Sequence, residues 1–164
     1  MQRCLLPVIL LLIAAAIQGN LPSWLTLKGG QPDLILVVLI AFALLLDPLS
    51  GALLGFLAGM LHGSVVGYSL GSFIVSRTII GFAAGSVTIR LFSENPVVPV
   101  LAAGGLTFCG EAVFLLANPT HDLLSSLNII LAKSLFNSLL TLIVYWLLRW
   151  IEVRRKIKLA SARL

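Results

Sequence analysis

Four ionisable residues stand inside long runs of apolar and small residues. They are His62, Arg77, Glu111 and Lys133. A charge near the centre of a bilayer costs about 2.5–3.5 kcal/mol on insertion scales, so each such residue needs a partner or a function. Arg77 and Glu111 carry opposite charges, and an ion pair between them would satisfy both.

The depth of these residues follows from counting along the helices that would carry them. Arg77 and Glu111 each lie about six residues, or ~9 Å, from the predicted outer ends of their helices, and His62 and Asn128 lie at a comparable depth. Lys133 lies deeper, at ~15 Å. We therefore expect one polar layer in the outer half of a bundle, in which Arg77 meets Glu111. Two interpretations stay open: a structural ion pair that locks the helices together, and a polar cavity that opens to the outside.

The elements that position these residues are predicted to be transmembrane helices. The chain is 59% hydrophobic and 10% charged, whereas an ordinary globular domain has about 25% charged residues. Its apolar runs are continuous rather than alternating, which favours helices over barrel strands. The sequence thus predicts an all-α polytopic membrane protein, a bundle of six transmembrane helices at about 4–21, 32–46, 48–67, 71–91, 96–117 and 123–151.

Three of the predicted segments have further features. The first resembles a signal peptide, and five helices would remain if it were cleaved or did not span. The second is short, so we expect it to be oblique or partly shielded by its neighbours. Asp47 and Pro48 suit the N-cap and first position of the third. Residues 1–152 form the predicted transmembrane domain, and 153–164 form a basic cytoplasmic tail.

The basic residues predict the orientation of the bundle. Lys28 lies on one predicted side, and Arg3, Arg90 and a basic cluster near the end of the chain lie on the other. Cytoplasmic loops carry the excess of Lys and Arg, so both termini are predicted to be cytoplasmic. The alternative role of the cluster is binding to anionic lipid or nucleic acid, but aromatic residues for base stacking are absent after Trp150. The cluster consists of Arg149, Arg154, Arg155, Lys156, Lys158 and Arg163.

Glycines recur at every fourth position through the third predicted helix. Without Cβ atoms they form a groove in which another helix can approach closely. The groove serves either packing inside this bundle or the docking of a partner helix. The ladder consists of Gly51, Gly55, Gly59, Gly63, Gly67 and Gly71.

No catalytic or metal-binding spacing occurs in the sequence. Cys4 and Cys109 are far apart, the two histidines are isolated, and HExxH, GxSxG and Walker motifs are absent. We therefore expect neither an enzyme nor a cofactor or metal site. Asp33, in Gln31-Pro32-Asp33, is predicted to be a plain N-cap of the second helix.

The stretch Pro32-Asp33-Leu34, followed by an apolar run and the glycine ladder, resembles the rod shape-determining MreD family. The ladder reads GFLAGMLHGSVVGYSLG from Gly55 to Gly71. The sequence departs from the family pattern at one position, because the usual aspartate of the family falls at Gly63. If that aspartate lines a pocket or contacts a partner, this chain lacks it or uses His62 in its place.

The resemblance implies a non-enzymatic subunit of the cell-elongation machinery in the bacterial inner membrane. Such a subunit would maintain cell shape by binding the bitopic protein MreC. It would support, directly or indirectly, the peptidoglycan synthase complex of RodA and a class B penicillin-binding protein. The expected partners are these proteins and membrane lipids, and no nucleic acid. The family's helix arrangement is also similar to the substrate-binding (S) components of vitamin transporters, so a small-molecule-binding subunit of such a transporter is the alternative.

Overall fold

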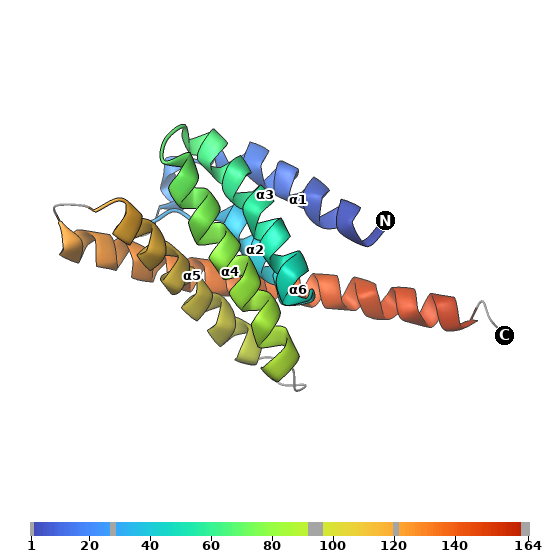
Figure 1. The fold of residues 1–164 in the computed structure, drawn as a ribbon. Coiled ribbons are helices and arrows are strands. Elements are labelled where there is room, and N and C mark those ends of the chain that lie inside the picture. Colours follow the sequence, from blue (N-terminus) through green and yellow to red (C-terminus); the bar gives the residue numbers. More distant parts are fainter. Residues whose placement is uncertain (1, 27–28, 92–96, 120–121, 162–164) are drawn as a thin grey trace.

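The computed structural model describes residues 2–26, 29–91, 97–119 and 122–161, and this part of the chain is helical, with no β-strand (Figure 1). The prediction of an all-α fold is confirmed for these residues. The fifth predicted span starts at 96, which lies outside the described residues, and so does Lys28. The helices are α1 (Gln2–Gln18), α2 (Leu34–Ala43), α3 (Pro48–Val66), α4 (Leu70–Leu91), α5 (Val97–Ala117) and α6 (Leu123–Ser161), with a 3-10 turn η1 (Ser23–Leu25).

Four of these helices are long and apolar enough to cross a membrane: α3, α4, α5 and α6. Helix α1 has 17 residues and α2 has 10. At 1.5 Å per residue α2 is ~15 Å long, about half of a hydrocarbon core of ~30 Å. Helix α2 therefore cannot cross the core by itself, and a bundle of six full spans stays a prediction.

Helix α2 forms the centre of the bundle. All of its residues from Ile35 to Ala43 are buried except the partly buried Val38, and it contacts every other α-helix. A helix that is apolar on all sides is suited to such complete enclosure. The shielding expected from its short length is therefore supplied by the neighbouring helices.

Helices α3 and α4 form a closely packed hairpin. Asp47 caps α3 and Pro48 begins it, as predicted. A Cβ atom added at Gly51, Gly55 or Gly59 would overlap the backbone of α4, and one at Gly63 would overlap Leu70. The groove along the first four glycines of the ladder is thus occupied by α4 of the same chain.

The last two glycines of the ladder do not take part in this packing. Gly67 ends α3 with φ 80°, the left-handed conformation that favours glycine at a C-cap. Gly71 lies in α4, and a Cβ atom at either position would meet open space. Successive members of the ladder are 40° apart around a helix, so six in register could not share one face.

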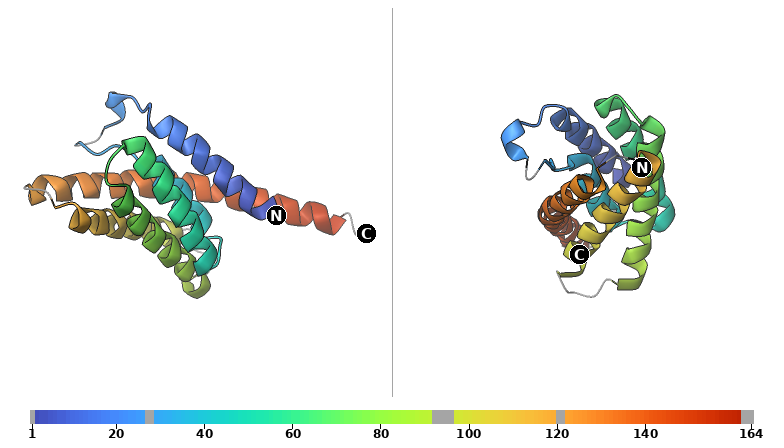
Figure 2. Two further views of the ribbon diagram at one scale, coloured as in Figure 1. Left: turned by 45° about the horizontal axis from the view of Figure 1, so that its top comes forward. Right: turned by 90° about the vertical axis from the view of Figure 1, so that its left-hand side faces the viewer.

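The first and the last described helix share one end of the bundle. Figures 1 and 2 show the start of α1 and the end of α6 on the same side of the bundle, opposite the α3–α4 turn. Helix α6 continues beyond the other helices to Ser161. Most of the predicted tail, 153–164, is therefore a continuation of α6, and residues 162–164 lie outside the described part of the chain.

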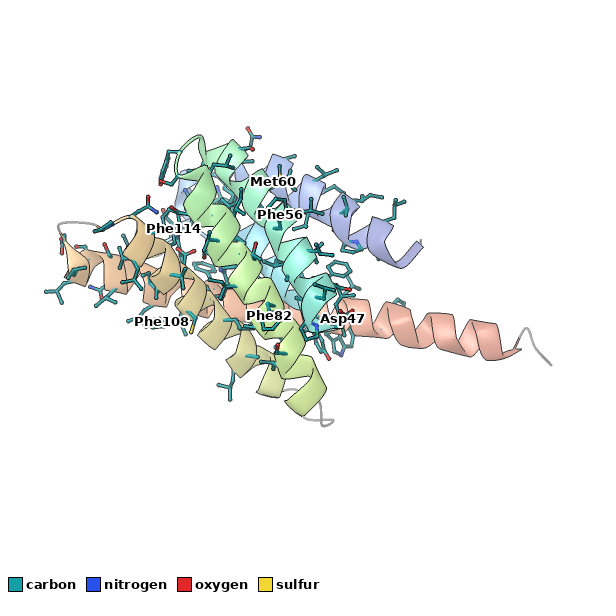
Figure 3. All side chains as sticks on the ribbon, viewed as in Figure 1. Asp47, Phe56, Met60, Phe82, Phe108 and Phe114 are labelled. Carbon is teal, nitrogen blue, oxygen red and sulfur yellow. The ribbon has the colours of Figure 1, made fainter. Side chains whose placement is uncertain are left out.

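Large apolar side chains cover the outside of the bundle. Phe56 and Met60 on α3, Phe82 on α4 and Phe108 on α5 are all exposed (Figure 3). Soluble monomers rarely expose contiguous apolar patches larger than a few hundred Å². The surface is suited to hydrocarbon rather than to water.

Candidate functional site

A network of charged side chains lies inside the bundle, centred on Arg77. The Arg77 side chain is 0% exposed, and its Nη2 atom donates to Asp33 Oδ2 at 2.7 Å and to Glu111 Oε1 at 2.9 Å. Lys133 Nζ donates to Glu111 Oε2 at 2.9 Å. We call Asp33, His62, Arg77, Glu111 and Lys133 the charge cluster. With His62 neutral, its two carboxylates and two cations balance.

The two carboxylates reach Arg77 from different elements. Glu111 and Arg77 were predicted to meet between α5 and α4, and the structure brings them together with Lys133 of α6 beside them. Lys133 is the member of the cluster with the most access to the surroundings, with a side chain 28% exposed.

Asp33 has a larger role than the plain cap that the sequence predicts. Its Oδ1 atom accepts from the Leu36 N–H at 2.9 Å and so caps α2, while Oδ2 binds Arg77. His62 Nδ1 lies 3.4 Å from the same Oδ2 atom. A signal for this second role was available, because a buried guanidinium has five N–H donors and Glu111 alone cannot satisfy them.

Asn137, rather than the predicted Asn128, contacts the charge cluster from α6. Asn137 is fully buried and its Oδ1 atom accepts from the Asp33 backbone N–H at 3.0 Å. Asn128 is exposed. The two positions are nine residues apart, which places them on opposite faces of one helix. Depth alone had suggested Asn128, whereas helical phase relative to Lys133 selects Asn137.

Aromatic rings close the cluster on the side of the α3–α4 turn. The Phe73 ring stacks on His62 with centroids 4.2 Å apart and contacts Phe114 of α5 at 4.4 Å. Phe114 is labelled in Figure 3, near the end of α5. Arg77 Cζ lies 5.5 Å from the Phe73 centroid, within the range of a cation–π contact. These rings give the guanidinium an apolar wall.

The helices are held at the spacing that these contacts need. Ser76 Oγ donates to the Gly110 carbonyl at 2.6 Å and accepts from Arg77 Nη1 at 3.2 Å. A Cβ atom at Gly110 would lie 2.9 Å from Ile80 Cγ1 and 3.6 Å from Arg77 Nη1. Glycine at this position therefore lets α5 approach the buried arginine.

The segment before α2 is fastened at both sides. Gln18 Nε2 donates to the Pro32 carbonyl at 3.1 Å, and the Leu34 N–H donates to Gln18 Oε1 at 2.7 Å. A Cβ atom at Gly30 would lie 3.0 Å from the Ile129 carbonyl oxygen and 3.3 Å from Lys133 Cγ. The residues of the Pro-Asp-Leu stretch thus begin α2 inside the bundle, beside α6.

The cluster is suited to holding helices together. Each of its carboxylates is bound by at least one cation, and the members come from α3, α4, α5, α6 and the start of α2. Among the described residues, no group of three His, Cys, Asp or Glu side chains could hold a metal ion. The described residues of the cluster thus form ion pairs between helices.

The comparison with protein families identifies the chain's relatives. Residues 1–152 match the family described as rod shape-determining protein MreD. In the comparisons with curated proteins and with solved structures, nothing matched. The family match covers every described helix up to the last turns of α6, and the apolar helices agree with a membrane protein. The chain therefore belongs to the MreD family of rod shape-determining membrane proteins.

Proposed function

We propose that this protein is a non-enzymatic subunit of the bacterial cell-elongation machinery in the inner membrane. It binds an MreC-like bitopic membrane protein, and it supports the peptidoglycan synthase formed by RodA and a class B penicillin-binding protein. The family match over residues 1–152 is the observation that carries this proposal.

The packing supports a scaffold. The charge cluster joins four helices and the start of α2, and the glycine ladder is occupied by α4. A partner helix would therefore dock on the outer apolar faces rather than in the ladder. Helix α1 offers such a face, because Leu5, Ile9, Leu12 and Ile13 are exposed on it. In lipid, shape-complementary packing and hydrogen bonds drive such docking.

Deletion of the gene tests the cellular role. We expect rod-shaped cells to become round or to stop growing after depletion, and re-expression of the intact chain to restore rods. Re-expression of a Gly71→Ala variant is the control and should also restore rods, since this position is exposed and open. Cells that remain rod-shaped and grow normally without the protein would contradict the proposal.

Photo-crosslinking in membranes tests the partner. A crosslinking amino acid placed at Ile9 or Ile13, both exposed on α1, is expected to capture MreC. The same residue at the buried Leu11 is the control and should capture nothing outside the chain. If crosslinkers on the exposed faces of α1 and α3 never yield MreC while the protein is active in cells, MreC binding is not its role.

Small-molecule binding, as in a vitamin transporter S component, is the second candidate. The partial exposure of Lys133, at the edge of an otherwise buried cluster, is the observation that favours it. Native mass spectrometry of the purified protein would then show a retained small molecule that Lys133→Gln releases. If the protein supports rod shape in cells and, after purification from them, carries only lipid, this candidate is excluded.

A further inference from the structure

A row of buried polar side chains lies between α5 and α6 and extends away from the charge cluster. Thr107 of α5 and Ser134, Asn137 and Thr141 of α6 are all less than 9% exposed. In each of them a side-chain N or O atom is buried and has no hydrogen-bond partner among the described residues. We call these four residues the polar seam.

The positions of these residues bring them together. Glu111 of α5 pairs with Lys133 of α6, and a Cβ atom at Gly104 of α5 would lie 2.7 Å from Ser138 Oγ. Thr107 lies between Gly104 and Glu111 on the same face of α5, and Ser134 and Asn137 lie between the two matching positions of α6. Thr141 is one turn beyond Asn137 on the same face. The seam thus begins beside the α2 cap, where Asn137 accepts from Asp33.

The seam differs from ordinary hydroxyls in apolar helices. Such groups usually donate to a carbonyl of the preceding turn, and Ser138 does so, with Oγ 2.7 Å from the Ser134 carbonyl. Thr107, Ser134 and Thr141 do not. Arg77 Nε, a further buried donor, is also without a partner among the described residues. Leaving several neighbouring polar groups unpaired is costly, and buried water typically bonds to two to four of them.

We propose that the polar seam is a binding site for ordered water molecules, which extend the polar layer of the charge cluster along α6 in the direction of its C-terminal end. The site supplies both donors and acceptors: the Asn137 amide donates, and the three hydroxyls donate or accept. This inference does not depend on the proposed partner or on the cellular role.

Replacing Thr107 or Thr141 by valine tests the proposal, because valine keeps the shape and removes the hydroxyl. If the hydroxyls bind water, each single variant lowers Tm by about 2–4 °C, the shift for one net hydrogen bond in a chain of this size. The double variant then loses less than the sum, since both groups serve one network. If the seam is dry, removing an unpaired hydroxyl leaves Tm unchanged or raises it, which would overturn the proposal.

Thr78 is the matched control for these substitutions. Its hydroxyl is also buried without a partner among the described residues, but it lies at the α3–α4 contact, where Gly55 approaches its Cα atom. Thr78→Val is therefore expected to leave Tm unchanged or raise it. An equal loss in Thr78→Val would mean that the effect is not particular to the seam, and the proposal would fail.

Radiolytic hydroxyl-radical labelling of the unmutated protein gives an independent measurement. Radicals formed from bound water modify adjacent side chains, so Tyr145, buried one turn beyond Thr141, is expected to be labelled. Leu54 of α3, equally buried, is the internal control. Labelling of Tyr145 should fall in Thr141→Val, whereas absent labelling in the unmutated protein, or labelling that Thr141→Val does not change, would overturn the proposal.

Discussion

Arg77 is a fully buried guanidinium whose Nη2 atom donates to two carboxylates. One arginine between Asp33 and Glu111 would leave a net negative charge inside the bundle, and Lys133 removes it. Buried ion pairs add little to stability compared with well-packed apolar residues, but removing one partner leaves a charge uncompensated. The cluster therefore makes each of its charged members sensitive to substitution.

Substitution of the central pair should be strongly destabilising. We expect Glu111→Gln and Arg77→Gln each to lower the free energy of unfolding by about 3–5 kcal/mol, because a buried charge loses its partner. The double variant should lose less than the sum. Lys133→Gln is the control and should cost less, because that side chain is partly exposed. Unfolding of the purified protein in detergent measures these effects, and single variants of full stability would show that the pair does not form.

Asp33 allows its two roles to be separated. Asparagine is as good an N-cap as aspartate but brings no charge to Arg77, so Asp33→Asn measures the loss of the ion pair. Asp33→Ala removes both and should cost about 1 kcal/mol more. Thermal unfolding of the two variants provides the comparison. An Asp33→Asn variant as stable as the unmutated protein would reduce Asp33 to a cap.

At the scale of elements, the close approach of the helices depends on glycines, which have no side chain. The glycines of α3 let its backbone lie against that of α4, and Gly110 does the same for α5 against the arginine. Helix α2 is short because it begins inside the bundle at Asp33 and ends before Asp47 begins α3. The contacts between these elements place the charge cluster.

The glycine contacts can be tested with one added methyl group. Gly55→Ala would push a Cβ atom into the Arg77 carbonyl. We expect a loss of about 1–3 kcal/mol from overpacking, despite alanine's better helix propensity. Gly71→Ala, where the space is open, should be neutral or slightly stabilising. Equal stability of the two variants in thermal unfolding would mean that α3 and α4 do not pack through Gly55.

The start of α3 should respond to pH. Ser50 donates to Asp47 from its hydroxyl and from its backbone N–H, and these bonds lower the pKa of Asp47 from its ordinary value of 3.8. A carboxyl whose pKa is lowered on folding contributes stability above 3.8 and loses it as the pH falls through its folded pKa. Asp47→Asn keeps a cap and cannot titrate. The Tm advantage of the unmutated protein over this variant should therefore shrink below pH 3.8, and a constant difference between pH 3 and 7 would exclude Asp47 as the titrating group.

At the scale of the whole molecule, the location of the start of α1 and the end of α6 agrees with the distribution of basic residues along the sequence. The start of α1 and the end of α6 lie at one end of the bundle (Figures 1 and 2), and the basic residues outside the helical interior concentrate at the same segments. The segment before α2 enters the bundle from the side of the α3–α4 turn (Figure 1), and the 10-residue α2 covers part of the distance to the other end. The predicted cytoplasmic location of both termini is thus compatible with the fold.

Cysteine accessibility tests the orientation. In a chain freed of Cys4 and Cys109, Thr26→Cys should react with a membrane-impermeant maleimide added to spheroplasts. Gln2→Cys and Ser161→Cys should react only after lysis, since Lys and Arg are retained on the cytoplasmic side. Reaction of Gln2→Cys in sealed spheroplasts would place the start of α1 outside and contradict the prediction.

Local patterns were sufficient for much of this protein. The apolar runs determined the helices and most of their limits, because a backbone in lipid must bond to itself. The rarity of charges in those runs singled out four members of the charge cluster, and counting along the helices brought Arg77 to Glu111. The family resemblance also rested on sequence alone, at Pro32-Asp33-Leu34 and the glycine ladder.

The partners of these residues were decided only by the tertiary structure. Asp33 meets Arg77 across 44 positions of sequence, and Asn137 replaces Asn128 because of the face of α6 that turns inward. The glycine ladder could have served a partner helix, but α4 fills its first four positions. A sequence determines which groups must be satisfied and where close approach is possible, whereas the crossing of helices far apart in the chain determines which groups satisfy one another.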